Sequence, residues 1–321
     1  MSTKEALLTL LEENRDRYLS GQQIGEQLGI SRAAICKAVK SLREQGMEIQ
    51  AVTNRGYRLN PQADRITSQS IQALLKDENF SFTLLPSVPS TNSDLREVAL
   101  QGAPEGTVVL ARQQTGGRGR MGRSFFSPQD SGLYLSLLLR PAELPPDQSL
   151  QITTTAAAAL CLAIEAETGL VPQIKWVNDL YLGKRKICGI LTEAALSMET
   201  GRLDYAVLGL GLNLYPPKEG FPPELQSIAG ALLPEPVENL KSRLTAAFLK
   251  RFKSFYGTRD FAAAARVYRS HCPLIGRKVL VGDGKEPVQV VDITDRCQLV
   301  LQDSQGKQFV LSYGEVSIVN L

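Results

Sequence analysis

Residues 114–123, which read Gln-Thr-Gly-Gly-Arg-Gly-Arg-Met-Gly-Arg, are the segment whose residue types point most directly to chemistry. Arg118, Arg120 and Arg123 alternate with glycines, which let a backbone approach a ligand closely and adopt positive φ. The guanidinium group offers a fixed fork of donors for carboxylate and phosphate oxygens. The segment predicts a loop that closes over a small anionic ligand, with a solvated basic loop or a nucleic-acid-binding loop as the alternatives.

Gly117, Gly119 and Gly122 also match the spacing of the dinucleotide-binding fingerprint. That fingerprint needs a strand before it and a helix after it. Residues 107–111 suit a strand, but Ser-Phe-Phe-Ser-Pro at 124–128 is not the start of a helix. The fingerprint also has no use for arginines at its variable positions, so a Rossmann interpretation is disfavoured.

Two polar segments could complete such a site. Ser90, Thr91 and Asn92 precede a predicted helix. Their side chains either cap this helix or bind a neutral polar ligand head. Residues 175–179, Lys-Trp-Val-Asn-Asp, end a predicted strand beside the only tryptophan of the chain. They form either a polar cluster at a site or a turn built on Asn-Asp.

Two further segments combine strands with cations or glycines. Residues 184–191 place Lys-Arg-Lys before an apolar stretch, which suits either a site or a solvated turn. Residues 209–213, Gly-Leu-Gly-Leu-Asn, place glycines inside a predicted strand. Such glycines indicate that something packs against the backbone.

Composition limits the classes of function. A chain of 321 residues predicts two or three domains, and a formal charge of +3 gives no overall field that favours nucleic acid. No apolar run approaches the roughly 18–20 residues of a membrane span, and the N-terminus lacks a signal-peptide pattern. We therefore expect a cytoplasmic protein without a membrane partner.

Cysteine and histidine usage excludes several kinds of site. The five cysteines are scattered without a Cys-x-x-Cys pair, and no catalytic or metal-binding motif surrounds the single histidine, His271. We expect neither disulfides nor metal-ligating residues. The chemistry must rest on arginine, lysine, aspartate and backbone groups.

The first 60 residues predict a winged helix-turn-helix. Apolar residues at helical spacing predict a first helix, Ser20 begins a second that Gly29 ends, and Ser31 caps a third over 32–45 that Gly46 ends. Strands at 48–52 and 57–59 form the β-hairpin wing.

Charge favours DNA binding by this unit. Residues 17–60 hold seven Lys or Arg against three Glu, a net +4 that exceeds the charge of the whole chain. The alternative is a small helical packing domain with a solvated face. The residues expected to face DNA are Ser31, Arg32, Ala33, Cys36, Lys37, Lys40 and Arg55.

The rest of the chain predicts an α+β domain and a small β domain. Beyond a linker at 60–64, strands are expected at 80–85, 107–113, 133–140, 173–177, 186–194 and 204–214, and helices at 68–76, 93–100, 149–168, 237–256 and 260–270. We expect the helices on one side of the sheet. After Pro273, about five short strands in under fifty residues predict an SH3-like barrel.

Taken in order, Ser-Thr-Asn, Gln-Thr-Gly-Gly-Arg-Gly-Arg, Lys-Trp-x-Asn-Asp, Arg-Lys-Ile-x-Gly-Ile-Leu and Gly-x-Gly-x-Asn resemble the motifs of biotin protein ligases. With the winged helix, the chain resembles the bifunctional kind, which also represses the biotin biosynthetic operon. The likeness covers essentially the whole chain. Lipoate ligases share the fold, but their glycine-rich segment lacks Gly-Arg-Gly-Arg.

The resemblance implies three domains: a winged helix-turn-helix at 1–63, an α+β ligase domain at 64–271 and an SH3-like C-terminal domain at 272–321. It implies activation of biotin by ATP and Mg²⁺ to biotinyl-5′-AMP, and transfer to a lysine of biotin carboxyl carrier protein. The adenylate would also act as corepressor, with a homodimer binding operator DNA.

Residue roles follow from the same resemblance. The catalytic set is Arg118, Arg120, Lys186 and Asp179, in which Lys186 polarises carboxylate and phosphate oxygens and Arg120 is the main clamp. Biotin contacts are expected from Ser90, Thr91, Asn92, Gln114, Arg118, Gly119, Arg120, Lys186, Gly189, Gly209 and Gly211, with the glycines making room for the apolar tail. Nucleotide contacts are expected from Arg120, Arg123, Phe125, Asn178, Lys186 and Asn213.

The chain departs from the family pattern in three places. Val177 stands where the family usually has proline, Met121 interrupts the arginine run, and the C-terminus has no arginine to reach the nucleotide. We therefore do not expect the last strand to contribute to ATP binding. Rival functions are a ligand-sensing regulator without catalysis, a ligase whose winged helix no longer binds DNA, and a lipoate ligase.

Overall fold

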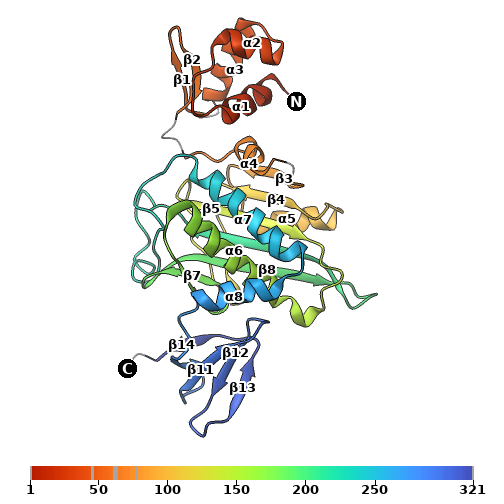
Figure 1. Ribbon diagram of the computed structural model, residues 1–321, viewed down its shortest axis with the longest axis vertical. Coiled ribbons are helices and arrows are strands. Elements are labelled where there is room, and N and C mark those ends of the chain that lie inside the picture. The colour runs from red at the N-terminus through yellow and green to blue at the C-terminus, as the bar shows by residue number, and fades with distance from the viewer. Residues whose placement is uncertain (1, 45–46, 61–63, 77, 320–321) are drawn as a thin grey trace. The chain divides into compact units, whose positions relative to one another are not determined.

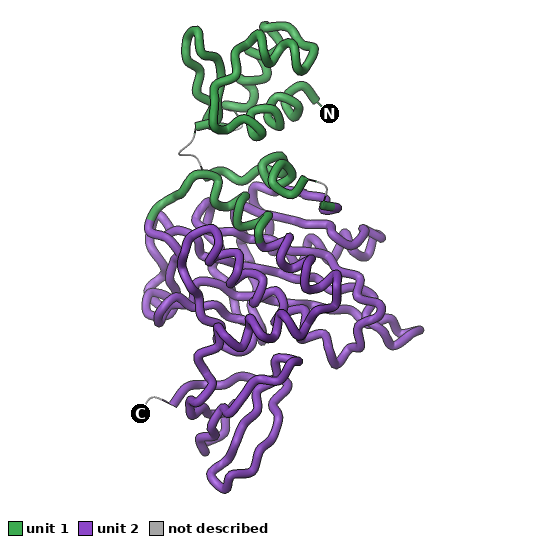
Figure 2. Tube along the Cα trace, in the orientation of Figure 1, with its two compact units in different colours: residues 1–78, 235–247 green, residues 79–234, 248–321 purple. Residues whose placement is uncertain are grey.

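The computed structural model describes residues 2–44, 47–60, 64–76 and 78–319, which divide into two compact units (Figures 1 and 2). One unit comprises Met1–Glu78 and Glu235–Ala247, and the other comprises Asn79–Pro234 and Phe248–Leu321. Residues 61–63 of the predicted linker lie outside the described residues. The domain boundaries at 63 and 271 therefore stay predictions.

The first unit contains the predicted winged helix-turn-helix. Its elements are α1 (Thr3–Glu13), α2 (Gly21–Leu28), α3 (Arg32–Glu44), β1 (Ile49–Val52) and β2 (Gly56–Leu59). Ser20 caps α2 in a capping box with Gln23, and Gly29 ends the helix at φ +65, as predicted. The predicted helix end at Gly46 lies outside the described part of the chain. Leu7, Leu11, Ile24, Ile35 and Val39 form the core.

Two contacts fix the wing within this unit. The ring of Tyr18 lies 4.6 Å from the Arg55 guanidinium and 4.7 Å from that of Arg58, and its hydroxyl donates to Gln50. Gly56, at φ +104, lies so close to the backbone of Leu19 that a Cβ would collide with it. The wing therefore depends on a glycine here.

A buried carboxylate joins α1 to α4 (Ser68–Leu75), which follows the wing in the same unit. Glu12 pairs with Arg15 at 2.5 Å and accepts a hydrogen bond from the Thr67 hydroxyl, the N-cap of α4, at 3.3 Å. Ser70 and Ser242 share a hydrogen bond of 2.6 Å between their buried hydroxyls. These contacts satisfy polar groups that would be costly to bury alone.

A seven-stranded mixed sheet, ordered β3-β4-β5-β9-β8-β7-β6, is the centre of the second unit. Only β3 and β4 run parallel, and the other neighbours are antiparallel. The strands are β3 (Ser81–Leu85), β4 (Thr107–Ala111), β5 (Gly132–Leu139), β6 (Gln173–Lys175), β7 (Asp179–Leu182), β8 (Arg185–Leu196) and β9 (Leu203–Asn213).

One strand was not predicted. The sequence suggested a single strand over 173–177, but β6 ends at Lys175 and the chain reverses through residues 176–178 into β7, which begins at Asp179. The Trp176–Val177 peptide bond in this turn is cis. The turn interpretation of Asn-Asp was therefore correct, and it places these two residues at the end of a hairpin.

Helices cover both faces of the sheet, so the expectation of helices on one side was wrong. Asn92, on α5 (Thr91–Leu100), bonds to Glu193 of β8, whereas Thr153, on α6 (Leu150–Thr168), bonds to Thr192. Adjacent residues of a strand point to opposite faces, so α5 and α6 lie on opposite sides. α8 (Phe261–His271) packs on α6, and α7 (Leu240–Gly257) precedes it (Figure 1).

α6 is the apolar core helix of this unit. Together with residues 146–149 it is long and apolar enough to cross a membrane by length and composition, but 72% of its apolar window is buried inside the protein. Its burial against β7, β8 and α8 accounts for that composition.

Five short antiparallel strands follow α8, as predicted. They are β10 (Lys278–Val281), β11 (Val288–Ile293), β12 (Leu299–Gln302), β13 (Gln308–Leu311) and β14 (Val316–Ile318), in the order β13-β12-β11-β10-β14. The arrangement agrees with the SH3-like barrel expected from sequence. The Trp176 indole donates to the Cys297 carbonyl at 2.8 Å, which ties this sheet to the β6–β7 turn.

Candidate functional site

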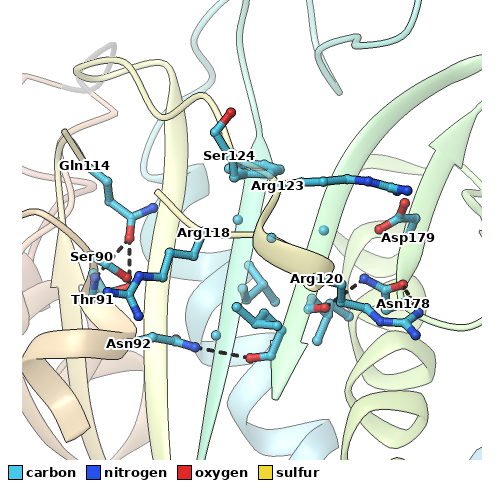
Figure 3. Close-up of a pocket in the computed structure, with 18 of the residues that line it drawn as sticks. Ser90, Thr91, Asn92, Gln114, Arg118, Arg120, Arg123, Ser124, Asn178 and Asp179 are labelled. Atoms are coloured by element: carbon cyan, nitrogen blue, oxygen red, sulfur yellow. Dashed lines mark hydrogen bonds between the residues drawn. The ribbon is translucent and has the colours of Figure 1, made fainter. Parts of the chain in front are cut away.

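A cavity of about 760 Å³, its open mouth included, lies on the α5 face of the large sheet (Figure 3). Every ligand-contacting residue predicted from sequence lines it except Asn213. Asn213 is buried at the end of β9, opposite Gly132. The remaining residues of the lining are Ser124, Ile190, Leu191, Leu210 and Glu315.

Three glycines form the floor of the cavity. Gly189 of β8 pairs with Gly211 of β9, and Gly209 lies two residues before Gly211 on the same face. A Cβ at Gly209 would collide with the Asn92 amide, and one at Gly211 would lie 2.5 Å from the Phe125 ring. The sequence assigned these glycines to a ligand tail, which stays a prediction; in the structure Gly209 and Gly211 make room for the Asn92 and Phe125 side chains.

A hydrogen-bonded polar cluster lies at one end of the cavity. The buried Ser136 hydroxyl is 2.8 Å from Thr91 Oγ1 and 2.6 Å from Asn92 Oδ1. Gln114 Oε1 accepts from the Thr91 backbone N–H at 2.9 Å, and its Nε2 donates to the Ser127 hydroxyl at 2.9 Å. Neutral donors and acceptors fixed in this way suit a neutral polar ligand head.

The cluster also decides between the two readings of Ser90-Thr91-Asn92. Ser90 occupies the N-cap position of α5, but its side chain makes no capping hydrogen bond. Thr91 and Asn92 turn their polar atoms toward the sheet, where the Asn92 amide donates to Glu193 Oε2 at 2.8 Å. These side chains therefore serve the cavity rather than the helix end.

The arginine loop crosses the cavity between β4 and β5. It contains only a short 3₁₀ turn, Arg120–Gly122, so the helix required by a dinucleotide fingerprint is missing between residues 112 and 131, all of which are described. Figure 3 shows Arg118 beside Ser90, Thr91 and Asn92, with Arg120 and Arg123 beside Asn178 and Asp179. The loop thus brings guanidinium groups to both ends of the cavity.

Lys186 brings a fourth cation to the site. Its Nζ lies 2.7 Å from Asp179 Oδ2, across the β7–β8 pair. The other carboxylate oxygen, Asp179 Oδ1, is buried and has no hydrogen-bond partner within the described residues. An unpaired buried carboxylate oxygen is costly unless something binds it, and the residue that carries this one lines the cavity.

Backbone hydrogen bonds hold Lys186 from the other side. Its N–H donates to the Ile228 carbonyl at 2.8 Å, and its carbonyl accepts from the Gly230 N–H at 2.9 Å. These bonds clamp the loop that follows β9 to the start of β8. The lysine is therefore fixed by two segments far apart in sequence.

Sequence reasoning missed three residues of this region. Ser136 is a polar residue inside one predicted apolar strand, and Glu193 is a charged residue inside another. A polar residue in an apolar strand indicates a specific contact, so both could have been identified from sequence. Glu315 carried no local signal, yet it lines the pocket from the turn before β14. The expectation that the last strand does not contribute to ATP binding stays a prediction. Within the described chain, no three His, Cys, Asp or Glu side chains gather in a way that could hold a metal ion.

The first unit presents a second candidate surface. All seven residues expected to face DNA are solvent-exposed, six of them on α3 or directly before it and Arg55 on the wing. Ser31 also caps α3 through a hydrogen bond from the Ala34 N–H. A groove between α3 and the wing is lined by Arg32, Cys36, Asn54 and Tyr57 among others. Cations around a groove of this kind suit phosphate contacts.

Comparisons with known proteins match both regions. Residues 84–213 match the biotin/lipoate A/B protein ligase family, and residues 3–58 match an HTH domain. The bifunctional ligase/repressor BirA of Bacillus subtilis is 32% identical over 318 residues, which cover 96% of this chain and 97% of that protein. The biotin–[acetyl-CoA-carboxylase] ligase of Mycobacterium tuberculosis is 32% identical over 239 residues, covering 71% of this chain and 85% of that protein.

A solved structure extends the match to the fold of the ligase part. The biotin protein ligase from Aquifex aeolicus in complex with biotin and ATP superimposes with a TM-score of 0.63 at 26% identity, covering 75% of this chain and 99% of that chain.

Proposed function

The chain belongs to the bifunctional ligase/repressor group of the biotin/lipoate A/B protein ligase family, and on this premise we propose how its residues carry out each activity. It is a biotin ligase that uses ATP, and a repressor that binds DNA through its helix-turn-helix. The observation that carries the residue assignments is one cavity with neutral polar groups at one end and the cations Arg120 and Arg123 at the other, where Lys186 pairs with Asp179.

The polar cluster would hold the ureido head of biotin. The ureido group is neutral, with one carbonyl acceptor and two N–H donors, and Thr91, Asn92 and Gln114 offer both kinds of partner. Their positions are fixed by Ser136 and Ser127, so little side-chain freedom is lost on binding. The ligand's apolar tail would then run over Gly189 toward the cations.

In the first step, a carboxylate oxygen of biotin attacks the α-phosphorus of ATP, and pyrophosphate leaves. Such phosphoryl chemistry depends on positioning and on neutralising the negative charge of the equatorial oxygens. Lys186 would contact the biotin carboxylate and the α-phosphate, and Arg120 would close over the resulting mixed anhydride. Phe125, whose ring lies on Gly211, would contact the adenine.

Mg²⁺ would accompany the ATP phosphates and neutralise part of their charge. The oxygen donors of the cavity that suit such an ion are the Asp179 carboxylate and the Asn178 amide oxygen.

In the second step, the carrier lysine amine attacks the carbonyl carbon of the adenylate, an amide bond forms, and AMP leaves. The amine must lose a proton in the course of this attack. The Asp179 carboxylate, which lines the cavity, would orient the amine and accept that proton.

Repression would depend on the same intermediate. We propose that biotinyl-5′-AMP orders the arginine loop, that the ordered protein forms a homodimer, and that two winged helices then reach two operator half-sites. A protein that acts on operator DNA works in the compartment that holds the DNA, which supports the expected cytoplasmic location.

Pyrophosphate release tests the ligase activity. The full-length protein is incubated with ATP and Mg²⁺ and with biotin, with lipoate or with neither acid. Biotin-dependent release, with adenylate retained on the protein, supports the proposal. Lipoate-dependent release would make the chain a lipoate ligase, and no release with either acid would leave a ligand-sensing regulator.

Operator binding tests the repressor mechanism separately. Affinity of the full-length protein for its promoter DNA is measured at several salt concentrations, with and without biotinyl-5′-AMP, beside sedimentation of the same samples. We expect tighter binding and more dimer with the adenylate, and affinity that falls steeply with salt. Equal affinity and equal dimer content in both samples would contradict the coupling.

A further inference from the structure

Each arginine of the loop at 117–125 reaches a different structural element, and two of the partners are carboxylates. Arg118 lies beside Glu193 of β8, Arg120 bonds to Asn178 of the β6–β7 turn, and Arg123 pairs with Glu315 before β14. Arg120 Nη1 is 3.1 Å from Asn178 Oδ1. Neither carboxylate has a place in the two-step reaction.

At the polar end of the cavity, Glu193 connects the head-binding cluster to the loop. Its Oε2 accepts the Asn92 amide at 2.8 Å, while its Oε1 lies 4.0 Å from Arg118 Nη1. The Arg118 and Glu193 side chains are 50% and 33% exposed, so water screens much of their attraction and the pair is a weak one. One carboxylate therefore touches both a residue that would contact the ligand head and the loop that would cover it.

At the other end, the turn between β13 and β14 contacts two arginines of the loop. The Gly314 carbonyl accepts from Arg120 Nη2 at 3.3 Å, and Glu315 Oε2 accepts from Arg123 Nη2 at 2.8 Å. Gly314 has φ +126, in the region that favours glycine, although no atom lies within 4 Å of the place a Cβ would take. The backbone of this turn, rather than side-chain packing, sets where the carbonyl and the carboxylate point.

We propose that Glu193 and Glu315 are positioning residues that hold the arginine loop closed, one at each end of the cavity. The C-terminal sheet then takes part in retaining the adenylate, through Arg123 and Arg120 rather than by direct contact. The part that concerns the adenylate rests on the proposed ligase function; the part that concerns loop closure does not.

The expected size of the effect follows from exposure. The Arg123 and Glu315 side chains are 66% and 39% exposed, and exposed ion pairs are weak. Removing one carboxylate should increase opening of the loop by a factor of about 1.5 to 5. Because the two carboxylates hold opposite ends of one loop, the double variant should open it by more than either single variant.

Limited trypsin digestion of the full-length protein measures loop opening directly, because cleavage after Arg118, Arg120 and Arg123 requires an accessible backbone. Peptides ending at these residues are quantified by mass spectrometry for the wild type, Glu193→Gln, Glu315→Gln, the double variant and Gly314→Ala. Glutamine keeps the shape of the side chain, removes the charge and retains one acceptor oxygen. Glu143→Gln is the matched control, because Glu143 forms a surface ion pair with Arg202, 3.6 Å away, outside the loop.

We expect faster loop cleavage in all four loop variants and no change in Glu143→Gln. The difference between the wild type and Glu315→Gln should shrink in 1 M salt, where charges are screened beyond about 3 Å; a purely structural role would not depend on salt in this way. Adenylate dissociation, measured after biotin and ATP are added, should quicken by a similar factor.

Two outcomes would overturn the proposal. Loop cleavage that is equal in the wild type and the double variant at low salt would show that the carboxylates hold nothing. If the double variant were cleaved faster than the wild type but both proteins showed the same salt dependence, the carboxylates would act through packing rather than through charge. Failure of biotin-dependent pyrophosphate release would remove the proposed function but leave the cleavage result intact, because cleavage is measured without any ligand.

Discussion

Lys186 Nζ lies 2.7 Å from Asp179 Oδ2, which pairs the cation of β8 with the carboxylate of β7 at the wall of the cavity. The pair leaves Asp179 Oδ1 without a partner in the described structure and leaves Lys186 two further N–H donors. When no ligand is bound, the carboxylate balances the charge of the cation. When an anionic ligand binds, the cation can turn toward it. In the proposed mechanism the two residues would act as one unit that supplies positive charge for the first step and a proton acceptor for the second.

Lys186→Ala should reduce the rate of adenylate formation by about 100- to 1,000-fold, the loss typical when one preorganised donor to a developing charge is removed. Lys184→Ala is the control, because Lys184 is an exposed cation two residues away. Single-turnover formation of adenylate from biotin and ATP is measured for both. An unchanged rate in Lys186→Ala would remove this lysine from the catalytic residues.

Asp179→Asn should slow transfer to the carrier more than adenylate formation, because the amide cannot take a proton from the incoming amine. The comparison uses preformed biotinyl-5′-AMP with carrier protein for the second step and pyrophosphate release for the first. The transfer rate of Asp179→Asn should recover in part as pH rises and more carrier lysine becomes neutral. Equal losses in both steps, without this recovery, would assign Asp179 to charge balance alone.

Arg120→Gly should leave the fold intact but let the adenylate escape, so that lysines of unrelated proteins become biotinylated. Arg120 is held by Asn178 and the Gly314 carbonyl above the cavity, and without it the loop loses contacts to both elements. Biotinylation of serum albumin added to the reaction is measured by streptavidin blot, with Arg202→Gly as a surface control. Labelling that stays confined to the carrier would contradict the role of Arg120 as clamp.

Much of this arrangement could be predicted from sequence because its signals are local. The helix start at Ser20, the helix end at Gly29 and the short C-terminal strands each depend on a few neighbouring residues. The site motifs are also short, and their order along the chain was enough to expect them in one cavity. The structure does bring them together there.

The remaining features depend on contacts between distant segments. Nothing near Glu315 indicates that its turn meets Arg123, 192 residues away in sequence. The apolar pattern of α5 shows that one of its faces is buried but not on which side of the sheet it lies. The β6–β7 hairpin was missed because a polar Asn-Asp at a strand end suits a site and a turn equally; here it forms the turn and lines the cavity.

Gly209→Ala and Gly211→Ala should weaken the binding of different ligands, biotin and ATP respectively. A Cβ at Gly209 displaces the Asn92 amide, whereas one at Gly211 displaces the Phe125 ring. We expect Gly209→Ala to raise KM for biotin by about tenfold or more with little change for ATP, and Gly211→Ala to affect KM for ATP more than Gly209→Ala does. Initial rates at varied biotin and ATP measure both. The reverse assignment would place the ligand head at the other end of the cavity.

Because of two buried thiols, the free energy of unfolding should decrease at alkaline pH. Burial raises the pKa of Cys272 and of Cys297 to about 11 each. Since an unfolded thiol titrates near pH 8.5, the stability that comes from their neutral forms is complete below that pH and is lost as pH rises toward 11. Each should contribute on the order of 2–3 kcal/mol to this loss. Urea unfolding between pH 8 and 11 should show a shallower slope in the Cys272→Ala, Cys297→Ala double variant.

Cys36 is the one exposed cysteine of the five, and it lies on the side of α3 expected to face DNA, 3.5 Å from the Tyr57 hydroxyl. A maleimide should therefore add once to the folded protein. The added bulk lies in the groove between α3 and the wing, where it would keep the helix out of the major groove of DNA. We expect a loss of operator affinity of at least tenfold, with the rate of biotin transfer unchanged because the ligase cavity belongs to the other unit. Cys36→Ser should make operator affinity insensitive to the reagent, which separates modification of this thiol from damage elsewhere. If modified protein bound operator DNA as tightly as untreated protein, α3 would not be the element that enters the groove.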